Sequence, residues 1–373
     1  MAEYKTLVKK IPVSPDKKTK QKDYLKKGQL PIVDQGQSLV GGYTDDANMT
    51  VECELPVIVF GDHTRAVKYI TFPFGAGADG IKVLQPKENI LPPFLYYGTQ
   101  YIVAKMPNRG YARHYQYVEK EDLPVPSLPE QERIVARIEE LFSQLDAGVE
   151  TLKKTKAQLA VYRQAVLKEA FSYCSEKKPI REMSSIVTSG SRGWAKYYCD
   201  NGAKFIRIGN LTRNKIYIDL DDIQHVQLPD KAEGTRTKLA PNDVLVSITA
   251  DLGSIGLVPN GIGEAYVNQH IAMIRFNNQM QGEFYAWYLR SEYGQQDLLR
   301  NKRGGGKLGL GLDDIRDSRV PVVSNETAES ILSIIECRLS VCDSIEHTVG
   351  LALQQAEAMR QSILKDAFEG KLT

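Results

Sequence analysis

The sequence predicts an α+β protein in which two globular α/β modules are separated by two long helices that pair as an antiparallel coiled coil. Three observations predict this class: a long stretch recurs within the chain, both copies carry the same heptad pattern, and the segments before them contain short strand-like runs. We place the first module at 1–127, the first helix at 128–177, the second module at 178–323 and the second helix at 324–373. The duplication implies an internal pseudo-two-fold repeat.

The repeat is clearest where Arg163–Phe171 (RQAVLKEAF) matches Arg360–Phe368 (RQSILKDAF), an offset of 197 residues from 171 to 368. The offset holds without a gap back to Pro124 and Pro321. Such an ungapped length indicates a duplication and not a chance match.

Both copies have apolar residues at alternating steps of four and three, which is typical of helices that pair along a narrow stripe. Gly148, Thr155 and Arg338 interrupt the stripe, so we expect tight pairing over part of its length. A helix of about 40 residues is roughly 60 Å long, and the two helices are expected to form a spacer. The stripe positions are 134, 138, 141, 145, 148, 152, 155, 159, 162 and 166 in the first copy and 331, 335, 338, 342, 345, 349, 352, 356, 359 and 363 in the second.

The segments before the helices mix β-branched runs with Gly, Asn and Asp turns, which predicts short strands joined by loops. The clearest runs are residues 56–60, 243–247 and 271–275. Phe94 and Phe284 lie in similar aromatic segments, and each is expected to open a short helix.

Composition excludes several classes of protein. A net charge of +2 neither requires nor excludes nucleic acid, because the clustering of positive charge matters more than its sum. The five cysteines form no C-x-x-C pair, which favours reduced thiols over disulfides or a zinc site. Residues 1–10 lack the apolar segment of a secretory signal, and no apolar run approaches the ~20 residues of a membrane helix. We therefore expect a cytoplasmic protein.

Three motifs suggest catalysis or nucleotide binding, and each fails at a necessary residue. Gly75–Gly80 fits G-x-G-x-x-G, but the following Ile81–Leu84 is strand-like where a helix should hold the pyrophosphate. Ile90–Phe94 resembles the N-P-P-Y/F motif of DNA adenine methyltransferases with Leu91 in place of the Asn or Asp. Gly304–Gly309 resembles a phosphate loop with Leu308 in place of Ser or Thr. We expect no catalytic residue, no metal site and no cofactor bound by this chain.

Loops rich in basic, amide and aromatic residues remain, and they have the chemistry of DNA contacts. Arg and Lys donate to guanine or phosphate, and Asn and Gln can bracket adenine. Solvated loops and core histidines also have this composition, but a duplicated reader suits a target with two separated half-sites. The candidate DNA-binding residues are His63, Arg65, Arg109, Arg113 and His114 in the first module, and Arg192, Arg207, Asn210, Arg213, Gln269, His270, Arg303 and Lys307 in the second.

Several of these segments resemble the specificity subunits of Type I restriction–modification systems over nearly the whole chain. The resemblance is carried by Phe60–Arg65 (FGDHTR), Phe72–Gly80, Gly110–His114 (GYARH), Leu128–Arg133 (LPEQER), the duplicated helix ends, Pro241–Leu245 and Val267–His270. The second helix departs from it, opening with Asn325-Glu-Thr-Ala-Glu329 instead of L-P-x-Q-E.

The resemblance implies a non-catalytic subunit whose two target recognition domains each read one half of a bipartite double-stranded DNA site, across a gap that the helices fix. Its implied partners are two modification (methyltransferase) subunits that use S-adenosylmethionine and dock on the helices, and restriction subunits that use ATP and Mg. Residues 77–80 would be a structural turn. Two other functions stay open: a self-contained DNA methyltransferase or nuclease, and a coiled-coil interaction scaffold.

Overall fold

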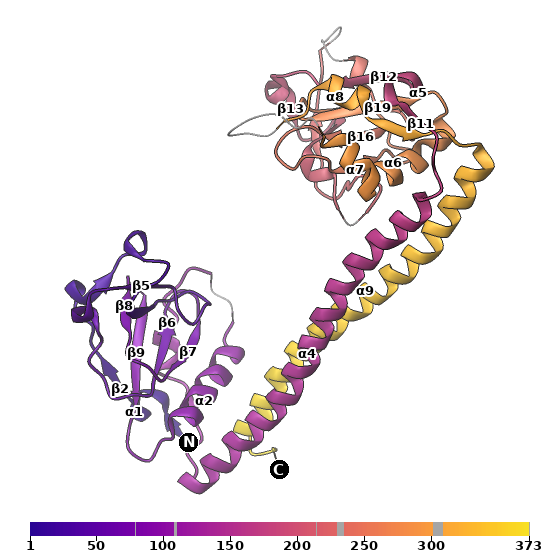
Figure 1. Ribbon diagram of the computed structural model, residues 1–373. Helices are drawn as coiled ribbons and strands as arrows, with labels where there is room; N and C mark the ends of the chain where they lie inside the picture. Colours follow the sequence, from indigo (N-terminus) through magenta and orange to yellow (C-terminus); the bar gives the residue numbers. More distant parts are fainter. Residues whose placement is uncertain (79, 108–109, 214, 230–234, 301–308, 373) are drawn as a thin grey trace. The chain divides into compact units, whose positions relative to one another are not determined.

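The computed structural model describes residues 1–372 except 79, 108–109, 214, 230–234 and 301–308. The chain forms two compact units: residues 1–154 with 349–373, and residues 155–348. Two helices of 44 residues, α4 (Leu128–Phe171) and α9 (Asn325–Phe368), each contribute one part to each unit. Figure 1 shows these two helices and the mixed strands and helices of the modules, which confirms the predicted fold class.

The first unit contains two four-stranded sheets. The antiparallel sheet has the order β2-β9-β6-β7 and is formed by β2 (Val8–Ile11), β9 (Ile81–Pro86), β6 (Val57–Gly61) and β7 (Val67–Ile70). The mixed sheet has the order β3-β8-β4-β5, from β3 (Lys18–Thr19), β8 (Gly75–Gly77), β4 (Leu30–Val33) and β5 (Gly42–Thr44). Helix α2 (Pro92–Lys105) packs on β6, β7 and β9 and buries Phe94 and Leu95.

The second unit also contains two four-stranded sheets. Its antiparallel sheet has the order β12-β19-β16-β17, from β12 (Ser184–Ser189), β19 (Ile271–Phe276), β16 (Val244–Ser247) and β17 (Ile255–Leu257). Its other sheet has the order β13-β15-β14-β18, from β13 (Tyr198–Cys199), β15 (Gln224–Val226), β14 (Ala203–Ile206) and β18 (Ala265–Val267). Helix α6 (Gly282–Arg290) packs on β16 and β17 as α2 does on β6 and β7. The antiparallel sheets of the two modules therefore share one strand order, and β18-β14-β15 matches β8-β4-β5 in the other sheets. The modules differ at one edge strand, because β3 pairs with β8 whereas β13 pairs with β15.

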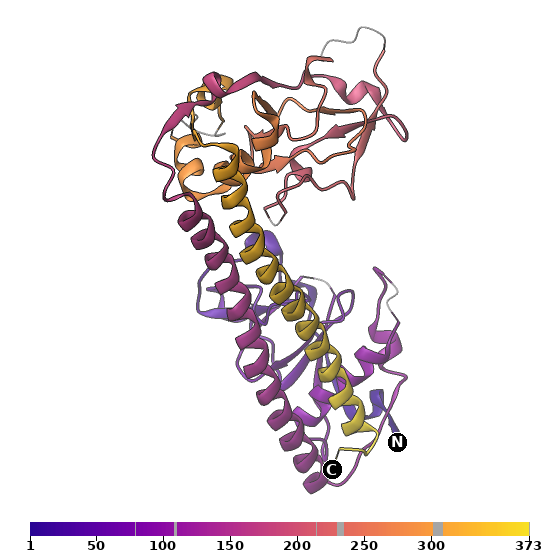
Figure 2. The same cartoon turned by 90° about the vertical axis from the view of Figure 1, so that its right-hand side faces the viewer.

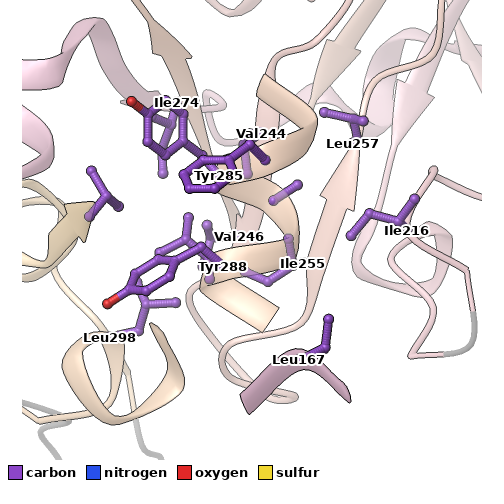
Figure 3. Close-up of a cluster of buried hydrophobic side chains, with 14 of the residues drawn as sticks. Leu167, Ile216, Val244, Val246, Ile255, Leu257, Ile274, Tyr285, Tyr288 and Leu298 are labelled. Carbon is purple, nitrogen blue, oxygen red and sulfur yellow. The ribbon is translucent and has the colours of Figure 1, made fainter. Parts of the chain in front are cut away.

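The core of the second unit lies between α6 and the antiparallel sheet. Figure 3 shows Tyr285 and Tyr288 of α6 among Val244, Val246 and Ile274 of the strands. Leu167 of α4 lies in the same buried cluster, so the long helix is part of this core.

The remaining elements are short. The two-residue strands β1 (Ala2–Glu3) and β10 (Asp122–Leu123) pair in the first unit, and β11 (Lys177–Pro179) pairs with β20 (Arg319–Pro321) in the second. The short helices are α1 (Tyr4–Leu7), α3 (Tyr115–Val118), α5 (Ile180–Met183), α7 (Glu292–Leu298) and α8 (Leu312–Asp317). The 3-10 turns among the described residues are η1 (Pro15–Lys17), η2 (Gln21–Asp23), η3 (Ala47–Met49), η4 (Trp194–Tyr197), η5 (Ile208–Asn210), η6 (Thr235–Thr237) and η7 (Gln279–Gln281). Within the described ranges, every helix is too short or too polar to span a bilayer.

The long helices run antiparallel in each unit, as can be followed in Figure 2. In the second unit Arg163 contacts Asp343 (2.5 Å) and Glu346 (3.0 Å), and in the first unit Arg360 pairs with Asp146. The 197-residue offset converts one pair into the other: Arg163 becomes Arg360 and Asp146 becomes Asp343. The ion pairs thus obey the pseudo-two-fold repeat.

The heptad stripe is buried over part of its length only, as predicted. Ile138, Leu159 and Val166 of α4 are buried, whereas Gly148 and Tyr162 are exposed. On α9, the predicted interruption at Arg338 is occupied by an ion pair with Glu169 (2.5 Å).

Each long helix ends against the module of the other repeat copy. Phe368, the last residue of α9, packs on Phe94 and Tyr101 of α2 with ring centroids 5.0 and 5.3 Å apart. Phe171, the last residue of α4, packs on Phe284 and Tyr288 of α6, both at 5.4 Å. This exchange makes each repeat copy necessary to the core of the other.

Candidate nucleic-acid interface

In the first unit, Asp62 follows β6 and joins its own loop to two others, one at Gly80 and one at His114 and Tyr115. Its backbone N–H donates to the carbonyl of Gly80 (2.6 Å), and its own carbonyl accepts from the backbone N–H of His114 (2.8 Å). Its buried carboxylate accepts from the backbone N–H of Tyr115 (2.8 Å) and lies 3.5 Å from Lys82. We call residues 34–37, 62–66, 78–80 and 106–114 the first loop cluster, of which 79, 108 and 109 lie outside the described residues.

The segment after β4 is the fourth part of this cluster. The Thr64 hydroxyl donates to the carbonyl of Gln35, and the ammonium of Lys68 donates to the carbonyl of Asp34 at 2.7 Å. Burial lowers the pKa of Lys68, and the Asp34 carboxylate opposes that shift. A buried cation on β7 therefore holds the β4–β5 loop against the β6–β7 loop.

Asp62→Ala should destabilise the first unit by about 1–3 kcal/mol, because the buried N–H of Tyr115 loses its acceptor. Urea unfolding of the full chain measures the loss. Asp62→Asn keeps an acceptor oxygen and should lose clearly less; an equal loss in both variants would mean that the hydrogen bond is not what holds the segments.

The second unit has the same junction. The backbone N–H of Ile248, in the loop after β16, donates to the carbonyl of His270 (3.0 Å), and its carbonyl accepts from the N–H of Leu310 (3.0 Å). The strand registers correspond as well, since Gly61 pairs with Ile81 and Ser247 with Ile271. We call residues 207–213, 248–254, 268–270 and 309–310 the second loop cluster, and the structure describes all of them.

All five candidate residues of the first module fall in the segments of the first loop cluster, and four of them are described by the structure. The Nδ1 of His63 lies 3.2 Å from the carbonyl of Ala112, and the Nε2 of His114 lies 3.2 Å from the carbonyl of Gly110. Arg65 is half-buried and donates to the carbonyl of Met106 at 3.3 Å. The remaining two are Arg113, which is exposed, and Arg109, which lies outside the described residues.

In the second loop cluster, Gln269 and His270 form a chain of polar contacts. The Nε2 of His270 lies 2.9 Å from the Gln269 amide nitrogen, and its Nδ1 lies 2.8 Å from the Thr249 hydroxyl. Arg213 reaches the loop after β16 through an ion pair with Asp251 (2.5 Å). This ion pair places the Arg213 guanidinium beside the loop, and the Asp251 carboxylate neutralises part of the guanidinium charge.

Two further candidates of the second module lie in or beside this cluster. Arg207 follows β14, and Arg192 is exposed in the segment whose Gly190 N–H donates to the carbonyl of Asn268 (3.2 Å). Arg303 and Lys307 lie outside the described residues.

Two candidates have structural hydrogen bonds in place of solvent contact. Asn210 is buried, accepts from the N–H of Arg207 (2.8 Å), and donates to the carbonyls of Asp219 (2.9 Å) and Asp222 (3.1 Å). His114 is also buried, at 1 % exposure. Both side chains hold loops in shape, so we do not assign direct base contacts to them.

A hollow of about 550 Å³ lies beside the second loop cluster, lined by Arg207, Asn268 and three aspartates, Asp219, Asp221 and Asp222. Three carboxylates repel phosphate, so the hollow is unsuited to the DNA backbone. In the part of the chain that the structure describes, no three His, Cys, Asp or Glu side chains gather to hold a metal.

The glycine motif of the first module does not form a nucleotide site. Residues 75–77 are strand β8, and β9 follows the turn where a dinucleotide fold needs a helix. Gly80 has a φ of +95°, the left-handed region that favours glycine in a turn. Most of the second glycine motif, 304–308, lies outside the described residues.

Three further side chains of the first loop cluster were not among the residues predicted from the sequence. Gln35 and Gln37 lie in the β4–β5 loop beside Thr64, and Tyr111 is 85 % exposed between Gly110 and Ala112. The amide-rich run Asp34-Gln-Gly-Gln37 directly after a strand was the available signal for the glutamines.

Comparison with known proteins identifies one family. The family model of the Type I restriction modification DNA specificity domain matches residues 10–160 and 175–353. The chain is 25% identical over 375 residues to the Type I restriction enzyme EcoBI specificity subunit of Escherichia coli, covering 90% of this chain and 74% of that one. It is 22% identical over 368 residues to the EcoR124I/EcoR124II specificity subunit of Escherichia coli, covering 91% and 88%.

Two solved structures share the fold. A chain from a study of complex assembly and conformational transition of the type I R-M system matches with a TM-score of 0.69 at 15% identity, covering 99% of this chain and 97% of that one. The HsdS subunit from Thermoanaerobacter tengcongensis matches with a TM-score of 0.50 at 16% identity, covering 99% and 96%.

Proposed function

The chain belongs to the Type I restriction modification DNA specificity family, and from this membership we propose that it reads a bipartite DNA target on behalf of catalytic partner subunits. The observation that carries the proposal is the pair of equivalent loop clusters. Each lies at the same edge of the same sheet in its module, and each contains basic and amide side chains. Two equivalent readers suit two half-sites.

We assign the two half-sites to residues 1–127 and 178–323 as target recognition domains. In this assignment, exposed Arg113 and Arg192 contact phosphates, while Gln269 and His270 present hydrogen-bonding groups to base edges. His63, Arg65, Arg207 and Arg213 border these positions. Arg109, Arg303 and Lys307 stay predicted contacts.

In this proposal, methylation and cleavage of the DNA are carried out by partner subunits. S-adenosylmethionine would be held by two modification subunits, and ATP and Mg by restriction subunits, with no catalytic centre or cofactor in this chain. Exposed apolar side chains on the long helices support protein docking there. In the second unit these include Val161 (72 % exposed), Val341 (55 %), Tyr162, Ile334 and Ile345.

Val341→Lys should weaken binding of the modification subunit about tenfold, because a charge would be buried in an apolar contact. Co-purification and a titration by analytical ultracentrifugation measure the change. His347→Lys adds the same charge at another exposed position of α9 and should leave binding unchanged. Equal effects, or none, would place the docking surface elsewhere.

The proposed function is tested by sequencing methylated adenines in DNA from a host that makes this chain with its neighbouring modification subunit. We expect a bipartite motif with a fixed gap, lost when this chain is deleted. Gln269→Ala should alter one half of the motif and leave the other intact.

Two results would contradict the proposal. Unchanged methylation despite an assembled complex would favour the interaction scaffold. Methylation by the isolated chain with S-adenosylmethionine would favour a self-contained methyltransferase.

A further inference from the structure

Tyr111 combines high exposure with a fixed orientation. Its side chain is 85 % exposed, yet its ring stacks on the His63 imidazole with centroids 4.3 Å apart and an interplanar angle of 5°. One face of the ring is therefore covered by His63, and the other face is open.

Two histidines hold the backbone on both sides of Tyr111. His114 contacts the carbonyl of Gly110 through Nε2, and His63 contacts the carbonyl of Ala112 through Nδ1, both at 3.2 Å. The N–H of Ala112 also donates to the carbonyl of Gly110 at 2.9 Å, which closes a tight turn around Tyr111. Gly110 has a φ of +64°, which favours glycine at this position.

Gly80 provides the space for the stack. A Cβ at residue 80 would lie 3.1 Å from Cδ2 of His63 and 2.6 Å from Oε1 of Gln35. A side chain there would displace the imidazole on which the tyrosine rests.

An exposed aromatic ring held in this way is suited to binding, because little conformational freedom is lost when it makes a contact. A ring that served only the stability of the loop would be covered by neighbouring side chains. The adjacent exposed cation, Arg113, and the other segments of the first loop cluster make DNA the matching partner.

We propose that Tyr111 is a specificity-determining residue, whose open ring face packs against a base of the first half-site, and that His63 and His114 are positioning residues that present it. The inference rests on the proposed function and goes beyond it by naming one base-contacting residue. Contact through the ring face does not require the tyrosine hydroxyl. In a duplex the ring face can reach the exposed edge of a base in a groove, and the loss of recognition at one base pair corresponds to roughly 5- to 150-fold in rate or affinity.

The test uses the complex of the full chain with its modification subunit and measures methylation rates on a set of single-base variants of the target. Tyr111→Ala should reduce the rate on the cognate site by at least about fivefold and erase discrimination at one or two adjacent positions of one half-site. Tyr111→Phe should behave like the wild type. His63→Ala and Gly80→Ala should reduce discrimination at the same positions less severely, because the ring remains but its platform is lost or displaced.

Tyr173→Ala is the matched control, since Tyr173 is 88 % exposed and lies outside both loop clusters; its base preferences should be unchanged. If Tyr111→Ala keeps the wild-type preferences while the wild-type complex reads a bipartite motif, the inference fails and the proposed function stands. An equal loss at both half-sites, together with a lower melting temperature, would also overturn it by showing a structural role.

Discussion

Phe171→Ala should lower the free energy of unfolding of the second unit by about 3–5 kcal/mol, and Phe368→Ala should do the same to the first unit. Both rings are almost fully buried, at 2 % and 5 % exposure. Each is the last residue of a long helix and fills the contact with the short helix of a module. Removing either ring leaves a cavity where the two repeat copies join.

The two effects can be separated because both tryptophans, Trp194 and Trp287, belong to the second unit. Tryptophan fluorescence during urea unfolding should therefore shift strongly for Phe171→Ala. Phe368→Ala should change mainly the circular dichroism transition. Val161→Ala, at an exposed position of α4, should change stability by less than about 0.5 kcal/mol. Equal tryptophan shifts for both phenylalanine variants would show that the two cores do not unfold separately.

The sequence predicted the duplication and the helices well, but it could not predict this exchange of helix ends. The 197-residue offset makes Phe171 and Phe368 equivalent, whichever module each one contacts. Their partners are set by the antiparallel direction of the helices, which brings the end of α9 to Phe94 and the end of α4 to Phe284. The repeat therefore shows which residues are equivalent, but it does not show which of them are in contact.

The helix starts show how structure explains a departure in the sequence. Gln131, in the LPEQER segment, is fully buried and bonds the carbonyls of Asn89 and Pro126 and the N–H of Leu91. The equivalent position in the second copy, Ala328, has no amide, and there Gln281 supplies one from the module side, to the carbonyl of Val323 and the side chain of Asn325. In both copies a glutamine amide bonds the start of the long helix to its module. The helix supplies this amide in the first copy, and the module supplies it in the second.

The candidate DNA-binding residues were harder to predict than the fold. His114 and Asn210 have the right chemistry for bases, but the structure buries both. Residue type cannot distinguish a side chain that faces solvent from one that holds a loop, because burial also depends on which distant segments pack against that loop. Tyr115 and Asp62, for example, are 53 residues apart.

Asp243→Ala should destabilise the second unit by about 3–5 kcal/mol, near the lower end because Arg275 keeps some contact with water. The Asp243 side chain is 1 % exposed and accepts from Nε and Nη2 of Arg275 at 2.8 and 2.6 Å and from the N–H of Ala240 at 2.7 Å. Hydrogen bonding to Asp243 raises the pKa of Arg275. The guanidinium also stays charged when this partner is removed, because the ordinary pKa of arginine lies far above neutral. Tryptophan-monitored unfolding in urea measures the loss.

The control is an ion pair of the same kind in solvent. Arg213 and Asp251 are 2.5 Å apart with side chains 63 % and 52 % exposed, and Arg213→Met should cost less than about 1 kcal/mol of stability. The double variant Asp243→Leu with Arg275→Met should lose less than Asp243→Ala alone, because no unpaired charge remains. If the double variant is at least as unstable as Asp243→Ala, then the loss of stability comes from altered packing at the start of β16 and not from an unpaired guanidinium. Strand β16 connects Asp243 to the segment of the second loop cluster that begins after Ser247. If the unpaired guanidinium destabilises this strand, Asp243→Ala should also weaken recognition of one half-site at temperatures where the wild type still recognises both.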